Sequence, residues 1–161
     1  MQNFVEKTNQ WFVQCFERLE TFSNKKIYLV LLFLTFIICA PMVIAYEIEN
    51  DSARVEHKDL DIFRDRAETI LDGDLLYRDT DYVTLSPPII NYLFVPAVLL
   101  GNTALVWVCW FAMFVFLSSV ILYQILILFF EKRYAIAGSV FFIVSPFSMY
   151  TTIMMMQDDA I

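Results

Sequence analysis

The chain has 161 residues, of which 59% are hydrophobic and 18% charged, and its net charge is −7. Soluble domains carry about 25% charged residues, so this composition argues against an ordinary soluble domain, and three glycines beside sixteen phenylalanines argue against a disordered one. Nucleic-acid binding is not expected, because no basic stripe is present to neutralise phosphates. Cys15, Cys39 and Cys109 are far apart in the sequence and two of them lie within apolar runs, so we expect small apolar side chains and not a disulfide framework or a metal site. The composition therefore predicts an all-α integral membrane protein.

Residues 1–26 have the pattern of an amphipathic helix. Apolar side chains recur at helical spacing, and charged and amide side chains lie between them. The apolar members are Val5, Trp11, Phe12, Cys15, Phe16, Leu19 and Phe22. This pattern is typical of a helix that lies in the membrane interface.

Three uncharged segments, 27–46, 102–130 and 134–156, are long enough for transmembrane helices. The first is too long and too far from the N-terminus for a cleaved signal peptide. The Glu131-Lys132-Arg133 break between the other two predicts a tight turn.

Positive charges set the expected orientation. Lys132 and Arg133 belong on the side of Lys25 and Lys26, the cytoplasmic side, so the N-terminus is cytoplasmic and residues 47–88 form an extracytoplasmic loop. That loop also contains five basic residues, so the charge rule discriminates weakly here. They are Arg54, Lys58, Arg64, Arg66 and Arg78.

Residues 89–101 form a short apolar segment before the second span. As a helix its dozen or so residues measure about 18–20 Å, against a core of about 30 Å, and Pro96 interrupts it. We therefore expect a juxtamembrane helix that does not cross. Two crossings then separate the first acidic loop from a second that begins at 157–161, and the two loops face the same compartment.

Within the first loop, residues 59–72 are predicted to form a helix that Gly73 closes in the left-handed conformation. At about 100° per residue the helix has an acidic face and an apolar face. The acidic face contains Asp61, Asp65, Glu68 and Asp72, and the apolar face contains Phe63, Ala67, Ile70 and, more peripherally, Leu60 and Leu71.

Asp59 projects onto the apolar side of this helix. A carboxylate in an apolar or membrane-proximal place is costly unless it is paired or used, so Asp59 is a candidate for a functional role. The alternative is that Asp59 caps the helix N-terminus, and the two roles are compatible.

The spacing around Asp59 continues through the loop. An aromatic residue follows four positions on, an alanine eight on, a glycine fourteen on and a tyrosine eighteen on: Phe63, Ala67, Gly73 and Tyr77. Arg78-Asp79 and Pro87-Pro88 come next. This pattern resembles the first external loop of the C-superfamily (GT-C) membrane glycosyltransferases, which use polyprenyl-phosphate-linked sugars such as dolichol-linked ones. They include the catalytic subunit of GPI mannosyltransferase I and many prokaryotic relatives.

Ser145-Pro146 and the later Gln157-Asp158-Asp159 are similar to the second acidic site of the same family. Met156 replaces the glycine that usually precedes the glutamine. In the first loop the family pair is D-x-D, so Asp59 is either its second member, with His57 in the first position, or its first, with Asp61 in the second. The resemblance covers residues 57–161, and such enzymes have many more than three spans. The chain therefore resembles the N-terminal part of a larger polytopic bundle.

The resemblance implies inverting transfer, with Asp59 as general base and Asp159 as the acid of the second site. Supporting acidic-motif roles are implied for Asp61, Asp158 and Gln157. Weaker candidates for binding phosphate or substrate are Arg66, Arg78, His57 and Tyr77, each of which also has a structural or solvent-facing interpretation. Mg²⁺ or Mn²⁺ held by carboxylates is the other way to neutralise the departing phosphate, and a single histidine excludes a multi-histidine metal site within this chain.

The implied partners are the bilayer, a polyprenyl-phosphate sugar donor and a sugar, lipid or protein acceptor. The implied location is the plasma membrane of a prokaryote or the ER membrane of a eukaryote. Three spans provide little surface to enclose a lipid donor, so the isolated chain is expected to need further C-terminal spans or a partner subunit. The alternative is a non-catalytic membrane scaffold with an acidic docking loop. A transporter fits less well, because no ionisable residue lies within the three spans.

Overall fold

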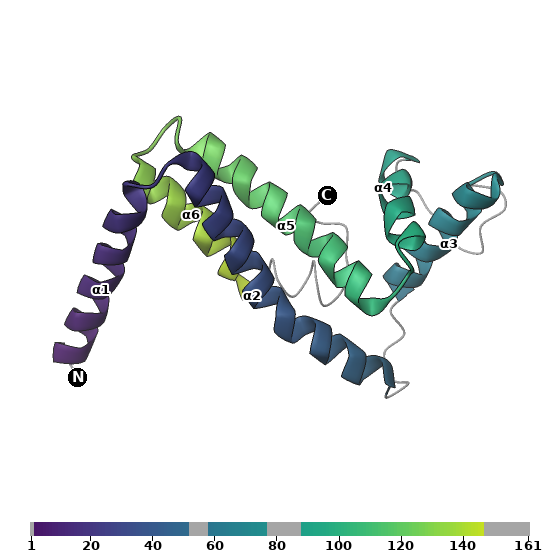
Figure 1. The fold of residues 1–161 in the computed structure, drawn as a ribbon, viewed down its shortest axis with the longest axis horizontal. Helices are drawn as coiled ribbons and strands as arrows, with labels where there is room; N and C mark the ends of the chain where they lie inside the picture. Colours follow the sequence, from purple (N-terminus) through teal and green to yellow (C-terminus); the bar gives the residue numbers. More distant parts are fainter. Residues whose placement is uncertain (1, 52–57, 77–87, 147–161) are drawn as a thin grey trace.

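The computed structural model describes residues 2–51, 58–76 and 88–146 (Figure 1). These residues form helices only, which confirms the all-α class for this part of the chain. The helices are α1 (Gln2–Glu20), α2 (Asn24–Asp51), α3 (Lys58–Asp72), α4 (Pro88–Leu99), α5 (Ala104–Leu126) and α6 (Lys132–Val144).

Two helices are long and apolar enough to cross a membrane. The qualifying segments are 24–41 in α2 and 105–126 in α5, which coincide with the expected spans 27–46 and 102–130. The helix α2 is longer than its apolar segment: its 28 residues measure about 42 Å and continue through the acidic sequence that follows residue 46. A change from apolar to charged residues marks the end of a predicted span, but it does not interrupt the backbone hydrogen bonding of a helix.

The helix α6 ends at a break within the expected third span. After α6 stops at Val144, Ser145 has an extended backbone, with φ −61° and ψ 123°. The ring of Pro146 disfavours a helical conformation in the residue before it, which explains this end. The 13 residues of α6 measure about 20 Å, less than the roughly 30 Å core. Residues 147–156 lie outside the described part of the chain, so a third crossing stays a prediction.

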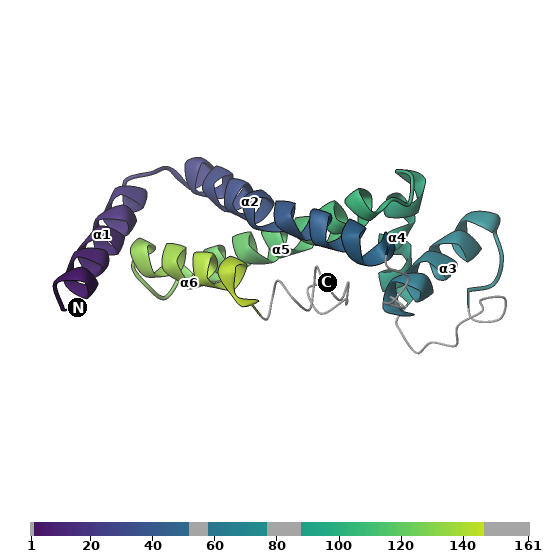
Figure 2. The same ribbon diagram turned by 90° about the horizontal axis from the view of Figure 1, so that it is seen from below.

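The helices α2, α5 and α6 pack side by side, with α5 antiparallel to the other two (Figures 1 and 2). The turn between α5 and α6 lies at the same end as the turn between α1 and α2. The pair α3 and α4 lies at the opposite end, beyond the start of α5 (Figure 1). Lys25 and Lys26 therefore share an end of the bundle with Lys132 and Arg133, as the charge pattern predicts.

Close packing within the bundle depends on small residues. A Cβ atom at Gly138 of α6 would lie 2.6 Å from Leu126 Cδ1 of α5, so the missing side chain allows these helices to approach. Thr35 and Ser139 are buried, and each hydroxyl donates to the backbone carbonyl four residues earlier, at 2.9 Å. Their polar groups are thus satisfied without a partner from another helix.

The end of the bundle near the lysines is tied together by polar contacts. Lys132 Nζ donates to the carbonyl oxygen of Glu20 at 2.9 Å and also to that of Phe22. Tyr123 of α5 donates its hydroxyl to Asn24 Oδ1 at 3.0 Å. The α5–α6 turn therefore caps the C-terminal end of α1 with a cation, which the helix dipole favours.

The amphipathic helix expected over 1–26 ends at Glu20 instead. The amide N–H groups of Thr21 and Phe22 donate to the carbonyls of Arg18 and Leu19, at 3.2 and 3.0 Å. Thr21 also donates its hydroxyl to the carbonyl oxygen of Arg18 at 2.7 Å. These short-range bonds close the helix and let the chain turn into α2.

The contact of Lys132 can be tested by substitution. Lys132→Met removes the ammonium group that bonds two carbonyls, so we expect the free energy of unfolding to fall by about 1.5–3 kcal/mol. Lys25→Met, which removes an exposed lysine near the same turn, should change it by about 0.5 kcal/mol or less. Reversible denaturation in detergent micelles, followed by circular dichroism, provides the measurement. Equal losses in both variants would contradict the capping role.

Candidate functional site

The predicted turn after α3 is confirmed. Gly73 has a φ of +81°, and its N–H donates to the carbonyl oxygen of Ile70 at 3.2 Å. The N–H of Asp74 donates to the carbonyl oxygen of Thr69 at 3.0 Å. These two bonds form a Schellman motif, in which glycine occupies the left-handed position at least cost.

The two predicted faces of α3 are largely present in the structure. Leu60, Phe63 and Ala67 are buried, whereas Glu68 and Asp72 are exposed. The helix α4 packs along the buried face, so this face is covered by the chain itself.

Two further residues of α3 differ from each other in exposure. Leu71, expected at the edge of the apolar face, is 43% exposed, which agrees with that peripheral position. Arg66, a candidate for phosphate binding, is only 2% exposed. Helical periodicity gives the angle of a side chain but not the width of the neighbouring element that covers it.

Arg66 joins α3 to α4. Its Nη1 donates to Asn91 Oδ1 at 3.0 Å, and Asn91 is fully buried. A hydrogen bond to a cation in a buried place is stronger than one between neutral groups, so this contact fixes the two helices relative to each other. Asn91 was not identified from the sequence. A signal was nevertheless present, because an asparagine inside an apolar segment needs a buried partner.

An aromatic cluster, composed of Phe63, Phe94, Trp107 and Phe111, connects α3 and α4 to α5. The rings of Phe63 and Phe94 are stacked, with centroids 4.3 Å apart and planes inclined by 19°. Phe94 also lies 5.9 Å from the rings of Trp107 and Phe111. Because Phe94 is fully buried at the centre, the cluster joins three helices through one side chain.

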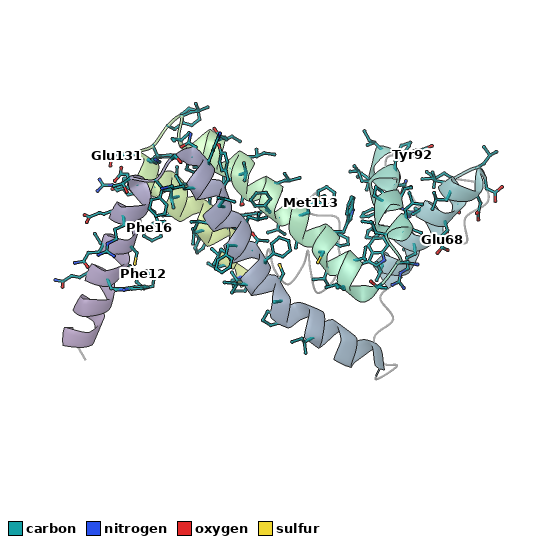
Figure 3. The ribbon with its side chains drawn as sticks, viewed as in Figure 1. Phe12, Phe16, Glu68, Tyr92, Met113 and Glu131 are labelled. Carbon is teal, nitrogen blue, oxygen red and sulfur yellow. The ribbon has the colours of Figure 1, made fainter. Side chains whose placement is uncertain are left out.

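Polar contacts border the aromatic cluster. Trp107 Nε1 donates to Asn102 Oδ1 at 2.7 Å, and Asn102 Nδ2 donates to Glu68 Oε1 at 3.4 Å. The guanidinium carbon of Arg64 lies 6.0 Å from the Trp107 ring centroid. Glu68 of the acidic face therefore contacts the turn between α4 and α5, and Figure 3 labels it on α3 opposite Tyr92 of α4.

The structure covers few of the predicted catalytic residues. Asp59 and Asp61 lie in the first turns of α3, where only their backbone is described. Six further predicted residues lie outside the described ranges: His57, Tyr77, Arg78, Gln157, Asp158 and Asp159. Among the predicted site residues, the described part of the chain therefore gives a side-chain environment to Arg66 alone.

A cavity of about 350 Å³ lies where the end of α3 meets the start of α4. Its walls include Ile70, Asp74, Leu76 and Tyr92. This volume is in the range of small ligand pockets. Within residues 2–51, 58–76 and 88–146 no three histidine, cysteine or acidic side chains gather in a way that could hold a metal ion.

A scan against protein-family models gave no match, and searches of the curated proteins and of the solved structures gave none either. The resemblance to GT-C enzymes therefore depends on the motif residues and their order alone.

The aromatic cluster predicts a stability effect. Phe94→Ala empties the centre of the cluster and should lower the free energy of unfolding by about 3–5 kcal/mol. Tyr92→Ala on the exposed side of α4 should cost about 1 kcal/mol or less. Denaturation in mixed micelles, followed by tryptophan fluorescence, measures both. Similar values for the two variants would contradict the central role of Phe94.

Proposed function

We propose that this chain forms part of an inverting membrane-embedded glycosyltransferase of the GT-C type. The enzyme transfers a hexose, mannose in the members that the motif resembles most, from a polyprenyl phosphate to a lipid, glycan or protein acceptor. The reaction takes place on the extracytoplasmic face. The observation that carries the proposal is the Asp59, Phe63, Ala67, Gly73 spacing on a folded helix at the end of the bundle opposite the lysines.

The packing of α3 supports this role for Asp59. The motif residues Phe63 and Ala67 are buried against α4, and Gly73 closes the helix. The spacing of the motif places Phe63 and Ala67 so that they anchor α3, and with it the first turn that contains Asp59, to α4 and the start of α5. A general base needs this kind of fixed support to stay within hydrogen-bond reach of an acceptor hydroxyl.

In the proposed reaction the hydroxyl oxygen of the acceptor attacks the anomeric carbon of the sugar. Asp59 accepts the proton that this hydroxyl loses. The bond to the lipid phosphate breaks on the opposite side, so the configuration inverts. The departing phosphate needs a positive charge. The burial of Arg66 and its bond to Asn91 favour a positioning role for that arginine. Arg78, His57 or a carboxylate-bound Mg²⁺ or Mn²⁺ then remain as the source of charge.

The membrane placement belongs to the same proposal. The apolar helices α2 and α5 cross the bilayer, and the segment that begins with α6 crosses it a third time. The α6 helix runs from the lysine end toward the end that carries α3 (Figure 2). This direction supports a second acidic site, with Asp159 as its acid, on the same face as Asp59. The membrane is the plasma membrane of a prokaryote or the ER membrane of a eukaryote.

A second function is a non-catalytic scaffold that docks other membrane components. The outward side of α4 favours it, because Ile89 and Leu99 are 71% and 68% exposed on an apolar helix. Such a surface fits contact with lipid or with a further helix. The scaffold and the enzyme make opposite predictions for the substitution of Asp59.

Asp59→Asn tests the catalytic proposal. Asparagine caps a helix as well as aspartate does but cannot act as the base, so sugar transfer should fall by about 10²–10⁴-fold. The measurement is transfer of labelled hexose from polyprenyl-phosphate hexose in membranes of cells that express the complete gene product. Asp72→Asn, a change of an exposed carboxylate on the same helix, is the matched control and should retain full transfer. Normal transfer by Asp59→Asn would assign Asp59 to capping alone, and a wild-type protein without any transfer would favour the scaffold.

A further inference from the structure

A groove lies between α1 and α6, at the end of the bundle opposite the candidate catalytic site. The two helices diverge from the α1–α2 turn, as Figures 1 and 2 show. The groove has a volume of about 350 Å³. Phe12, Val13 and Phe16 of α1 form one wall, and Tyr134 and Ala137 of α6 form the other. Figure 3 shows Phe12 and Phe16 on the side of α1 that faces α6.

The groove has one cation and one anion among its lining residues. Arg133 comes from the first turn of α6, and Glu17 comes from α1. Glu131 accepts a bond from Arg133 Nη2 at 2.6 Å, and this carboxylate raises the pKa of the guanidinium above its usual range. Within the described part of the chain, Arg133 Nε is buried without a hydrogen-bond partner.

The α1 wall continues into exposed apolar surface. Trp11, Phe12 and Val13 are each at least half exposed, at 60%, 51% and 50%. Three successive large apolar residues on a surface are unfavourable in water, whereas tryptophan and phenylalanine on an amphipathic helix are typical of the headgroup region of a bilayer. The groove therefore opens beside a surface that fits lipid.

The two charges select among lipid headgroups. A net anionic headgroup would meet Arg133 but would be repelled by Glu17 and Glu131. A phosphate that carries its own ammonium group satisfies both sides: the phosphate accepts hydrogen bonds from the guanidinium, and the ammonium donates to a carboxylate. A quaternary choline group has no N–H to donate. The volume fits a headgroup and the upper part of an acyl chain, not a whole lipid.

We propose that the groove between α1 and α6 binds an ethanolamine phospholipid, with the phosphate at Arg133, the ammonium at Glu17 and the acyl chain against Phe12, Val13 and Phe16. This site holds a structural lipid on the cytoplasmic side and is separate from the donor site at α3. It depends on the membrane placement of the chain but not on sugar transfer.

Native mass spectrometry of the detergent-solubilised full chain, titrated with phosphatidylethanolamine, phosphatidylcholine or phosphatidylglycerol, tests the proposal. Phosphatidylethanolamine should bind about tenfold more tightly than the other two, since one charge-assisted hydrogen bond corresponds to about that factor. Arg133→Gln should reduce its binding by about the same factor. Arg18→Gln, which removes an exposed arginine of α1 that does not line the groove, should leave binding unchanged.

Glu17→Gln is expected to increase the affinity for one lipid, and a misfolded variant would not show such an increase. Without this carboxylate, phosphatidylglycerol should bind several-fold more tightly than it binds the wild-type chain, while phosphatidylethanolamine loses its advantage. Equal binding of all three lipids to the wild-type chain, or an unchanged preference in Glu17→Gln and Arg133→Gln, would overturn the proposal. Either result would leave the glycosyltransferase proposal standing, because no step of sugar transfer enters the measurement.

Discussion

The stacking of Phe63 on Phe94 fixes α3 and α4 to the start of α5. Phe94 lies at the centre of four aromatic rings, and through it α3 is held by α4 and by the first turns of α5. The bond between Arg66 and Asn91 joins the same two helices and needs the same register between them. The bond from Asn102 to Glu68 depends on the same arrangement. Aromatic area supplies the free energy here, and the polar contacts select one orientation.

Much of the local structure follows from the sequence, because it depends on short-range chemistry. Gly73 closes α3 in the left-handed conformation, and Phe63 and Ala67 face inward, since helical spacing and glycine at a helix end are properties of neighbouring residues. The short length of α4 is equally local. The exposure of Leu71 agrees with its peripheral position on the apolar face, whereas the partner that Arg66 meets when it is buried is not encoded by any pattern within α3.

In the candidate site, too, features that depend on neighbouring residues were predictable, and features that depend on another helix were not. The position of Asp59 within a helix was predictable, whereas Asn91, which bonds Arg66, lies 25 residues away along the chain on another helix. The end of α1 at Glu20 and the end of α6 at Val144 also do not follow from composition. Apolar character continues past Val144 and through Phe22, but Pro146 and the bonds of Thr21 end the helices for reasons of backbone geometry that hydropathy does not contain.

The bond from Lys132 to the carbonyls of α1 also has a consequence for biogenesis. Lys132 and Glu20 are 112 residues apart, so this contact at the C-terminal end of α1 forms only after the ribosome has synthesised both α5 and the following turn. At about 5–20 residues per second this interval lasts roughly 6–20 s. During that time α2 is complete, but α1 is not yet docked against α6. The attachment of the N-terminal helix is therefore a late event in the assembly of this protein, although the helix is the first part of the chain to be made.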